Sequence, residues 1–80
     1  MKNKAIQLAT GIVIDPSIHA GRPVISGTRV PADIVVGRVA AGMTVQVVAD
    51  EYGIATEDVY NALRYAAQRL AEEQVWVTAG

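Results

Sequence analysis

The sequence predicts a mainly α-helical protein with a small N-terminal β element, arranged as a three-helix, helix-turn-helix-like bundle of the homeodomain-like or winged-helix-like kind. Residues 6–30 are rich in β-branched side chains and are divided by glycine and proline, a composition typical of short strands and turns. From Pro31 onward, the apolar residues recur at the spacing of amphipathic helices. Three successive stretches of this kind each have a start and a stop signal.

Two short strands are expected in the N-terminal part. Residues 11–15, GIVID, form the first strand and end at an Asp-Pro pair, and residues 23–26, PVIS, form the second. Residues 28–31, TRVP, are expected to extend the second strand across a turn or bulge. We expect Gly27 to take a positive φ at that turn, because glycine adopts this conformation without steric cost.

The first helix is expected to begin at Pro31 and to stop at Gly42. Proline suits the first helical turn, where its missing N–H leaves no hydrogen bond unmade. Asp33 then lies at the positive end of the helix dipole. Gly42 is a natural residue just beyond a helix C-terminus.

Two more helices follow, capped by Thr44 and Thr56. The second is expected to run to Gly53, and the third from Glu57 to about Glu73. A small residue within the second helix and a glycine at the turn are typical of a helix-turn-helix unit over residues 45–64. The apolar stripes that would form its core are Val45, Val48, Ala49 and Tyr52 in the second helix and Val59, Ala62, Leu63, Ala66 and Leu70 in the third.

The bulk composition predicts one small domain over residues 1–80, with a β arm (1–30), a helical core (31–73) and a C-terminal tail (74–80). Such a short chain has a marginal core, and the absence of cysteine excludes disulfides and thiolate zinc sites. We therefore expect a homo-oligomer, most simply a homodimer. No run approaches the roughly 18 apolar residues of a membrane span. The expected location is the cytoplasm.

No catalytic, metal or cofactor site is predicted. His19 is the single histidine and lies near Asp15 and Ser17, but nucleophilic triads are recognised by geometry and not by proximity in sequence. The carboxylates show no metal-ligand spacing. We expect a protein that is not an enzyme.

Four residues of the third helix are candidates for DNA contact: Thr56, Tyr60, Asn61 and Arg64. They are expected to face outward near its N-terminus, where Asn61 would suit adenine and Arg64 guanine. The net charge of −1 and the acidic Glu57 argue against strong, autonomous DNA binding. A solvated or partner-binding helix face is the alternative, and the sequence leaves both open.

Four further residues are candidates for a partner or dimer interface: Arg22, Arg29, Tyr65 and Trp76. The two arginines are expected to bond helix C-terminal carbonyls or carboxylates such as Asp15 and Asp50, with contact to DNA phosphate or an acidic partner as the alternative. Aromatic side chains are enriched at interface hot spots. Trp76 would anchor a strand-like tail, VWVT, on another chain.

The segment AGRPVISGTRVPADIVVGRVAAGMTVQVVADEYGIATEDVYNALRYAA resembles the domain-of-unknown-function family 433 over roughly residues 12–67. The resemblance rests on a glycine–basic–Pro-x-Ile-x-Gly-Thr-Arg-hydrophobic run, a later Ala-Gly and an Ala-Leu in the third helix. These residues are Gly21, Arg22, Pro23, Ile25, Gly27, Thr28, Arg29, Val30, Ala41, Gly42, Ala62 and Leu63. Residues 21–31 are expected to form a structural clasp, two short strands that lead into the first helix. The residues expected to be structural are Gly21, Pro23, Ile25, Gly27, Thr28 and Pro31 in this clasp, and Gly42 and Gly53 after the first two helices.

The resemblance implies a helix-turn-helix-like domain that acts as an antitoxin beside a small PIN-like ribonuclease. It implies neutralisation of that toxin by direct binding, and repression of its own operon through promoter DNA. Two alternatives stay open at this stage. One is a stand-alone helix-turn-helix transcriptional regulator, and the other is an oligomeric adaptor that does not bind DNA.

Overall fold

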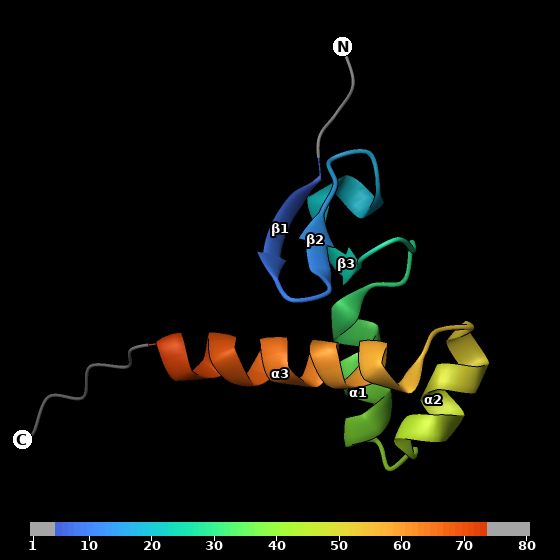
Figure 1. Cartoon of the computed structure of the whole chain (residues 1–80). Helices are drawn as coiled ribbons and strands as arrows, with labels where there is room; N and C mark the ends of the chain where they lie inside the picture. Colours follow the sequence, from blue (N-terminus) through green and yellow to red (C-terminus); the bar gives the residue numbers. More distant parts are fainter. Residues whose placement is uncertain (1–4, 74–80) are drawn as a thin grey trace, which may run out of the picture.

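The computed structural model describes residues 5–73, which form a small sheet followed by three helices (Figure 1). This arrangement confirms the predicted fold class. Between the second and third strands lies a short 3-10 turn, η1. The elements in chain order are β1 (Ile6–Ala9), β2 (Ile12–Ile14), η1 (His19–Gly21), β3 (Pro23–Ile25), α1 (Ala32–Ala40), α2 (Val45–Tyr52) and α3 (Thr56–Glu72).

The sheet is antiparallel with strand order β1-β2-β3. Strands β2 and β3 lie where the sequence predicted them, and Ile12 pairs with Ile25 in their register. Strand β1 was not predicted as a separate strand. Its short segment IQLA carries a single β-branched residue, and a register shift between Gln7 and Ala9 interrupts its pairing with β2.

Residues 28–31 do not extend β3, which corrects the prediction. Gly27 has the expected positive φ, +79°, but there the chain turns back on itself. The Thr28 hydroxyl donates to the Ile25 carbonyl (2.8 Å) and accepts from the Val30 N–H (3.0 Å), which fixes the tight turn. The returning chain then pairs with β3 through a single bridge between Val24 and Pro31.

The ends of α1 and α2 follow the predicted signals closely. Pro31 is the N-cap of α1 and not its first residue, so that helix begins one residue later than expected. Gly42, with φ of +106°, follows its C-terminus. The Thr44 Oγ1 accepts from the Val47 N–H (3.1 Å) and caps α2, and Gly53 ends α2 in the left-handed conformation.

Helix α3 begins at Thr56 and is capped differently from the prediction. Thr56 is the first residue of the helix and Ala55 is its N-cap. The carboxylate of Asp58 reaches back to accept from the Ala55 N–H (3.0 Å), so a side chain inside the first turn replaces the expected threonine cap. Acidic residues at this end also suit the helix dipole.

The core lies where α3 packs across α1 and α2 and beneath the sheet (Figure 1). The predicted stripe of α3 is only partly internal, because Val59 and Ala62 are buried whereas Leu70 is 69% exposed. In Figure 1 the C-terminal half of α3 extends past α1. Within residues 5–73, no helix has both the length and the apolar composition to cross a membrane. Val24 is buried in the sheet, and the contiguous buried cluster consists of Ile12, Ile25, Ala32, Val35, Val48, Ala49, Val59 and Ala62.

Candidate interaction surfaces

The α2–α3 unit has the crossing that a helix-turn-helix pattern predicts. Ala49 is buried in the middle of α2, next to the buried Val48, and Val59 of α3 belongs to the same core cluster. The Ile54 N–H donates to the Ala49 carbonyl (3.0 Å), which closes the turn around Gly53. A small residue at this point lets the two helices approach each other closely.

Of the four residues proposed for DNA contact, Tyr60 and Arg64 are exposed, and Thr56 is half-buried. Asn61 is only 8% exposed, so the expectation that it faces outward is wrong. Its side chain lies over Gly11 in the β1–β2 turn. A Cβ placed on Gly11 would come within 2.5 Å of the Asn61 Nδ2. Asn61 therefore joins the third helix to the β hairpin.

Arg64 is occupied by neighbouring side chains of its own helix. Its Nη2 donates to the Glu57 Oε2 (2.6 Å) and to the Asn61 Oδ1 (2.8 Å). The first of these contacts is an ion pair between two exposed side chains. Contact with DNA through the Nη2 of Arg64 would therefore compete with this ion pair.

The helix-turn-helix unit carries more acidic than basic side chains. Residues 45–64 include Asp50, Glu51, Glu57 and Asp58 and one basic residue, Arg64, which pairs with Glu57. These four carboxylates flank the turn between α2 and α3, in the last turn of one helix and the first turn of the other. A surface of this charge repels nucleic-acid phosphates and suits a basic protein partner.

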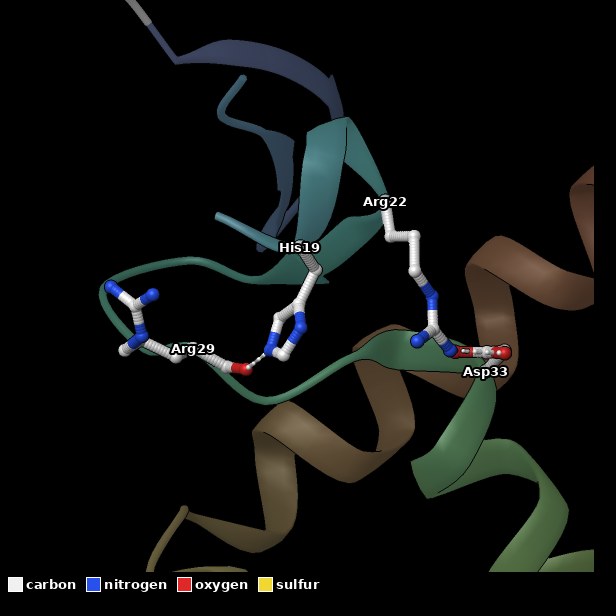
Figure 2. A network of polar contacts seen from close by, with 4 residues as sticks. All are labelled: His19, Arg22, Arg29 and Asp33. Carbon is white, nitrogen blue, oxygen red and sulfur yellow. Dashed lines mark hydrogen bonds and ion pairs between the residues drawn. The ribbon is translucent and has the colours of Figure 1, made fainter. Parts of the chain in front are cut away.

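The clasp residues Arg22 and Arg29 behave differently from each other (Figure 2). The Arg22 Nη2 donates to both carboxylate oxygens of Asp33 on α1 (2.7 and 2.8 Å), so a carboxylate partner was expected correctly but the wrong one was named. Arg29 contributes its backbone carbonyl, which accepts from the Nε2 of His19 (2.9 Å). Figure 2 shows the Arg29 guanidinium turned away from both contacts.

His19 thus has a structural contact that sequence reasoning missed. His19 and Ala20 both have left-handed backbone conformations, with φ of 49° and 55°. Residues with a Cβ rarely adopt this conformation, because the Cβ comes too close to the following carbonyl oxygen. The hydrogen bond to Arg29 spans the loop and ties these residues to the turn before α1. The sequence has no pattern that predicts a positive φ at two consecutive residues other than glycine.

Asp15 and Ser17 hydrogen-bond to each other in a local turn, and His19 bonds to Arg29 instead of joining them in a catalytic triad. The Ser17 hydroxyl and N–H both donate to the Asp15 Oδ1 (2.7 and 2.9 Å). These hydrogen bonds hold the pKa of Asp15 below its ordinary value, with a smaller contribution from the positive charge of Arg29. Among residues 5–73, no cluster of His, Cys, Asp or Glu has the arrangement of a metal site.

A shallow apolar groove lies between α1 and the C-terminal half of α3. Its volume is about 390 Å³. Tyr65, a predicted interface residue, lines this groove and is half-buried. Trp76, the other predicted aromatic anchor, lies outside the described residues. The residues lining the groove are Pro23, Ala32, Asp33, Val36, Gly37, Tyr65, Ala66, Arg69 and Leu70.

The chain is similar to known proteins over about two thirds of its length. The chain is 40% identical over 52 residues to a Mycobacterium tuberculosis protein named "Putative antitoxin VapB45", a match that covers 65% of this chain and 22% of that protein. The X-ray crystal structure of Rv2018 from the same organism matches 65% of this chain and 24% of its own, at 40% identity and a TM-score of 0.60. The chain thus spans about a quarter or less of each relative's length. Residues 12–66 match the model of the protein family of unknown function DUF433, and the chain belongs to that family.

Proposed function

We propose that this protein is an antitoxin-like component that binds and neutralises a small PIN-like ribonuclease. The observation that carries the proposal is the 40% identity to a protein named as an antitoxin. The match covers most of this chain but only 22% of the relative, so the proposal concerns the part that the two share.

The acidic α2–α3 unit is the surface that we assign to the ribonuclease. A ribonuclease binds the phosphates of RNA, and lysine and arginine side chains supply much of that attraction. The exposed carboxylates of Glu51 and Glu57 provide complementary charge, and the exposed ring of Tyr60 lies on the same helix as Glu57. Charge complementarity of this kind accelerates association and favours one partner over others.

A second function, repression of its own operon, is favoured by the helix-turn-helix shape and opposed by its charge. Tyr60 and Arg64 are exposed on α3, as a DNA-reading helix would require. The four carboxylates of residues 45–64 act against it. DNA contact through Thr56, Tyr60 and Arg64 therefore ranks below binding of the ribonuclease.

The test is affinity purification from the native host at moderate salt, with mass spectrometry of the proteins that co-elute. A stoichiometric PIN-like ribonuclease, whose cleavage of RNA stops when the purified chain is added, is the expected result. Recovery of promoter DNA without a protein partner would contradict the proposal and favour a transcriptional regulator.

Charge reversal then tests the surface. The double variant Glu51→Lys, Glu57→Lys should inhibit the ribonuclease about ten-fold more weakly, because rim charges of one sign control encounter with a basic partner. The matched comparison sets each single variant, Glu51→Lys and Glu57→Lys, against Glu73→Lys, which reverses one exposed carboxylate at the far end of α3. Equal inhibition by these single variants and by Glu73→Lys would assign the contact to another surface.

A further inference from the structure

Asn61 has an amide nitrogen that the described chain does not use. The residue is only 8% exposed, and its Oδ1 accepts from the Arg64 Nη2 (2.8 Å). Because a guanidinium can only donate, this contact fixes which end of the amide is the oxygen and places the Nδ2 over Gly11. Within residues 5–73, the Nδ2 itself donates no hydrogen bond, and the Gly11 carbonyl accepts from the Ser26 N–H instead.

This nitrogen borders a small pocket. Every fully buried side-chain nitrogen or oxygen in the described part of the chain has a hydrogen-bond partner, so the unbonded Nδ2 is accessible. Asn61 lines a pocket of about 150 Å³ between α3 and the β1–β2 turn, which points toward that helix in Figure 1. An almost wholly buried donor destabilises a protein until it finds an acceptor. The pocket therefore favours a ligand that supplies one.

The other polar side chains of the pocket are hydrogen-bond donors as well. Arg64 and Gln68 follow Asn61 on the same face of α3, at spacings of three and seven residues. Thr10 lines the pocket from the β1–β2 turn and adds a hydroxyl. The Arg64 Nη2 makes both contacts of that side chain, with Glu57 and Asn61. Its Nε and Nη1 groups have no acceptor elsewhere in the described chain, so they can donate to a ligand.

A carboxylate matches these donors better than a phosphate does. The guanidinium and amide groups are planar, as a carboxylate is, and arginine can bond both carboxylate oxygens at once. Arg64 is the only charged residue among those that line the pocket, and its contact with Glu57 already neutralises part of its charge. A phosphate monoester would bring roughly two negative charges close to Glu57 with no second cation to balance them. The pocket therefore suits a small planar group with a single negative charge.

We propose that the pocket between the β1–β2 turn and α3 is a carboxylate-binding site, in which Asn61 and Arg64 hold the carboxylate of a small ligand or of an acidic side chain on a partner protein. The proposal does not rest on the antitoxin function. Its ligand is acidic, whereas the surface around Glu51 and Glu57 is assigned to a basic partner, so either proposal can fail while the other holds.

Nuclear magnetic resonance of the ¹⁵N-labelled 80-residue chain tests the site, because the Asn61 side-chain amide gives signals of its own. Sodium acetate, compared with sodium chloride at equal ionic strength, should shift the signals of the Asn61 Nδ2 and the Arg64 Nε. The shifts should saturate with a dissociation constant of about 10 mM, as expected for so small a ligand. Acetyl-glutamyl amide then separates the two sources. Binding at least as tight as that of acetate assigns the pocket to an acidic side chain of a partner protein, and binding of acetate alone assigns it to a small ligand.

Two variants test the residues that hold the carboxylate. Arg64→Gln should weaken acetate binding about ten-fold, because it removes both the charge and the paired donors. Asn61→Asp, which replaces the amide donor by a second carboxylate of the same size, should abolish the shift of the Arg64 Nε. Circular dichroism should show that both variants keep their helical content, and Arg64→Gln decides the outcome if Asn61→Asp unfolds.

The matched control is Arg69→Gln, which removes an arginine of the same helix that has an ion pair of its own and lies outside the pocket. It should leave the dissociation constant within about two-fold of the unaltered value. Shifts no larger than those with sodium chloride would overturn the proposal, and so would equal weakening by Arg64→Gln and Arg69→Gln. Inorganic phosphate that binds about ten-fold more tightly than acetate would also overturn it and assign the pocket to a phosphate group.

Discussion

The two halves of α3 differ in what covers them. In the N-terminal half, Val59, Asn61 and Ala62 are all buried, with α1, α2 and the β hairpin around them. In the C-terminal half, Ala66 is half-buried and Leu70 is largely exposed. The helix keeps its apolar spacing throughout, so the difference arises from how much of the chain is available to pack against each half.

Two glycines reflect the same contrast. Gly11 has a φ of +75° and lies against Asn61, so the fold of this chain requires it. Gly37 has an ordinary helical conformation and open space where a side chain would lie. The comparison teaches that the first half of α3 is covered by the other elements of this chain, whereas the second half and its groove stay exposed within residues 5–73.

Gly11→Ala should cause the largest loss of stability. A methyl group at this point meets a backbone conformation that alanine disfavours, and it clashes with the Asn61 side chain at 2.5 Å. Together these effects should lower the free energy of unfolding by about 2–4 kcal/mol. Urea denaturation followed by circular dichroism measures the change.

Gly27→Ala is the matched control for this prediction. Gly27 has a similar φ of +79°, but a Cβ there would meet no atom within 4 Å. Only the conformational cost applies, so the loss should be about 1–2 kcal/mol. Equal losses for the two variants would show that the contact between Asn61 and the hairpin contributes nothing to stability. The N-terminal half of α3 would then not depend on Gly11 for its packing.

Gly37→Ala should have a smaller effect of opposite sign. Alanine is the better residue inside a helix, and nothing in the described chain obstructs its methyl group. The free energy of unfolding should rise by about 0.5–1 kcal/mol. A loss of stability would mean that Gly37 serves the packing of this chain, as Gly11 does, and would break the comparison between the two glycines.

The helix boundaries could be predicted because their signals are local. Thr44 and Gly53 act on the backbone within a few residues of themselves, whatever the rest of the chain does. Strand β1 and the return of residues 28–31 could not be predicted in the same way. Both depend on pairing with β2 or β3, and short segments gain their strand conformation from such pairing.

The exposure of a candidate site residue could be predicted only where it depends on the period of a single helix. The exposed positions of Tyr60 and Arg64 follow from the helical period. The burial of Asn61 does not, because the β hairpin that covers it packs on a side of α3 that a three-helix pattern leaves in solvent. The contact between Arg22 and Asp33 joins residues from different elements, so several carboxylates were equally reasonable partners. The proposed DNA contacts of Thr56, Tyr60, Asn61 and Arg64 stay predictions.

The smallest effects are expected from the ion pairs of the two halves of α3. Glu57 bonds Arg64 at 2.6 Å at the start of the helix, where a negative charge also interacts well with the helix dipole. Glu72 lies 3.5 Å from Arg69 at the other end, where a negative charge is unfavourable. Glu57→Gln should therefore lower the free energy of unfolding by about 0.5 kcal/mol, and Glu72→Gln should leave it unchanged or raise it slightly.

Salt tests whether the difference between the two carboxylates is electrostatic. Both pairs are exposed, so 1 M sodium chloride should remove most of the difference between Glu57→Gln and Glu72→Gln. A loss for Glu57→Gln that persists in high salt would have a different cause. Arg64 also donates to the buried Asn61, so a persistent loss would mean that Glu57 holds Arg64 in place to keep Asn61 over the hairpin. The ion pair would then belong to the structural half of α3, and its opening for contact with a nucleic acid would destabilise the fold itself.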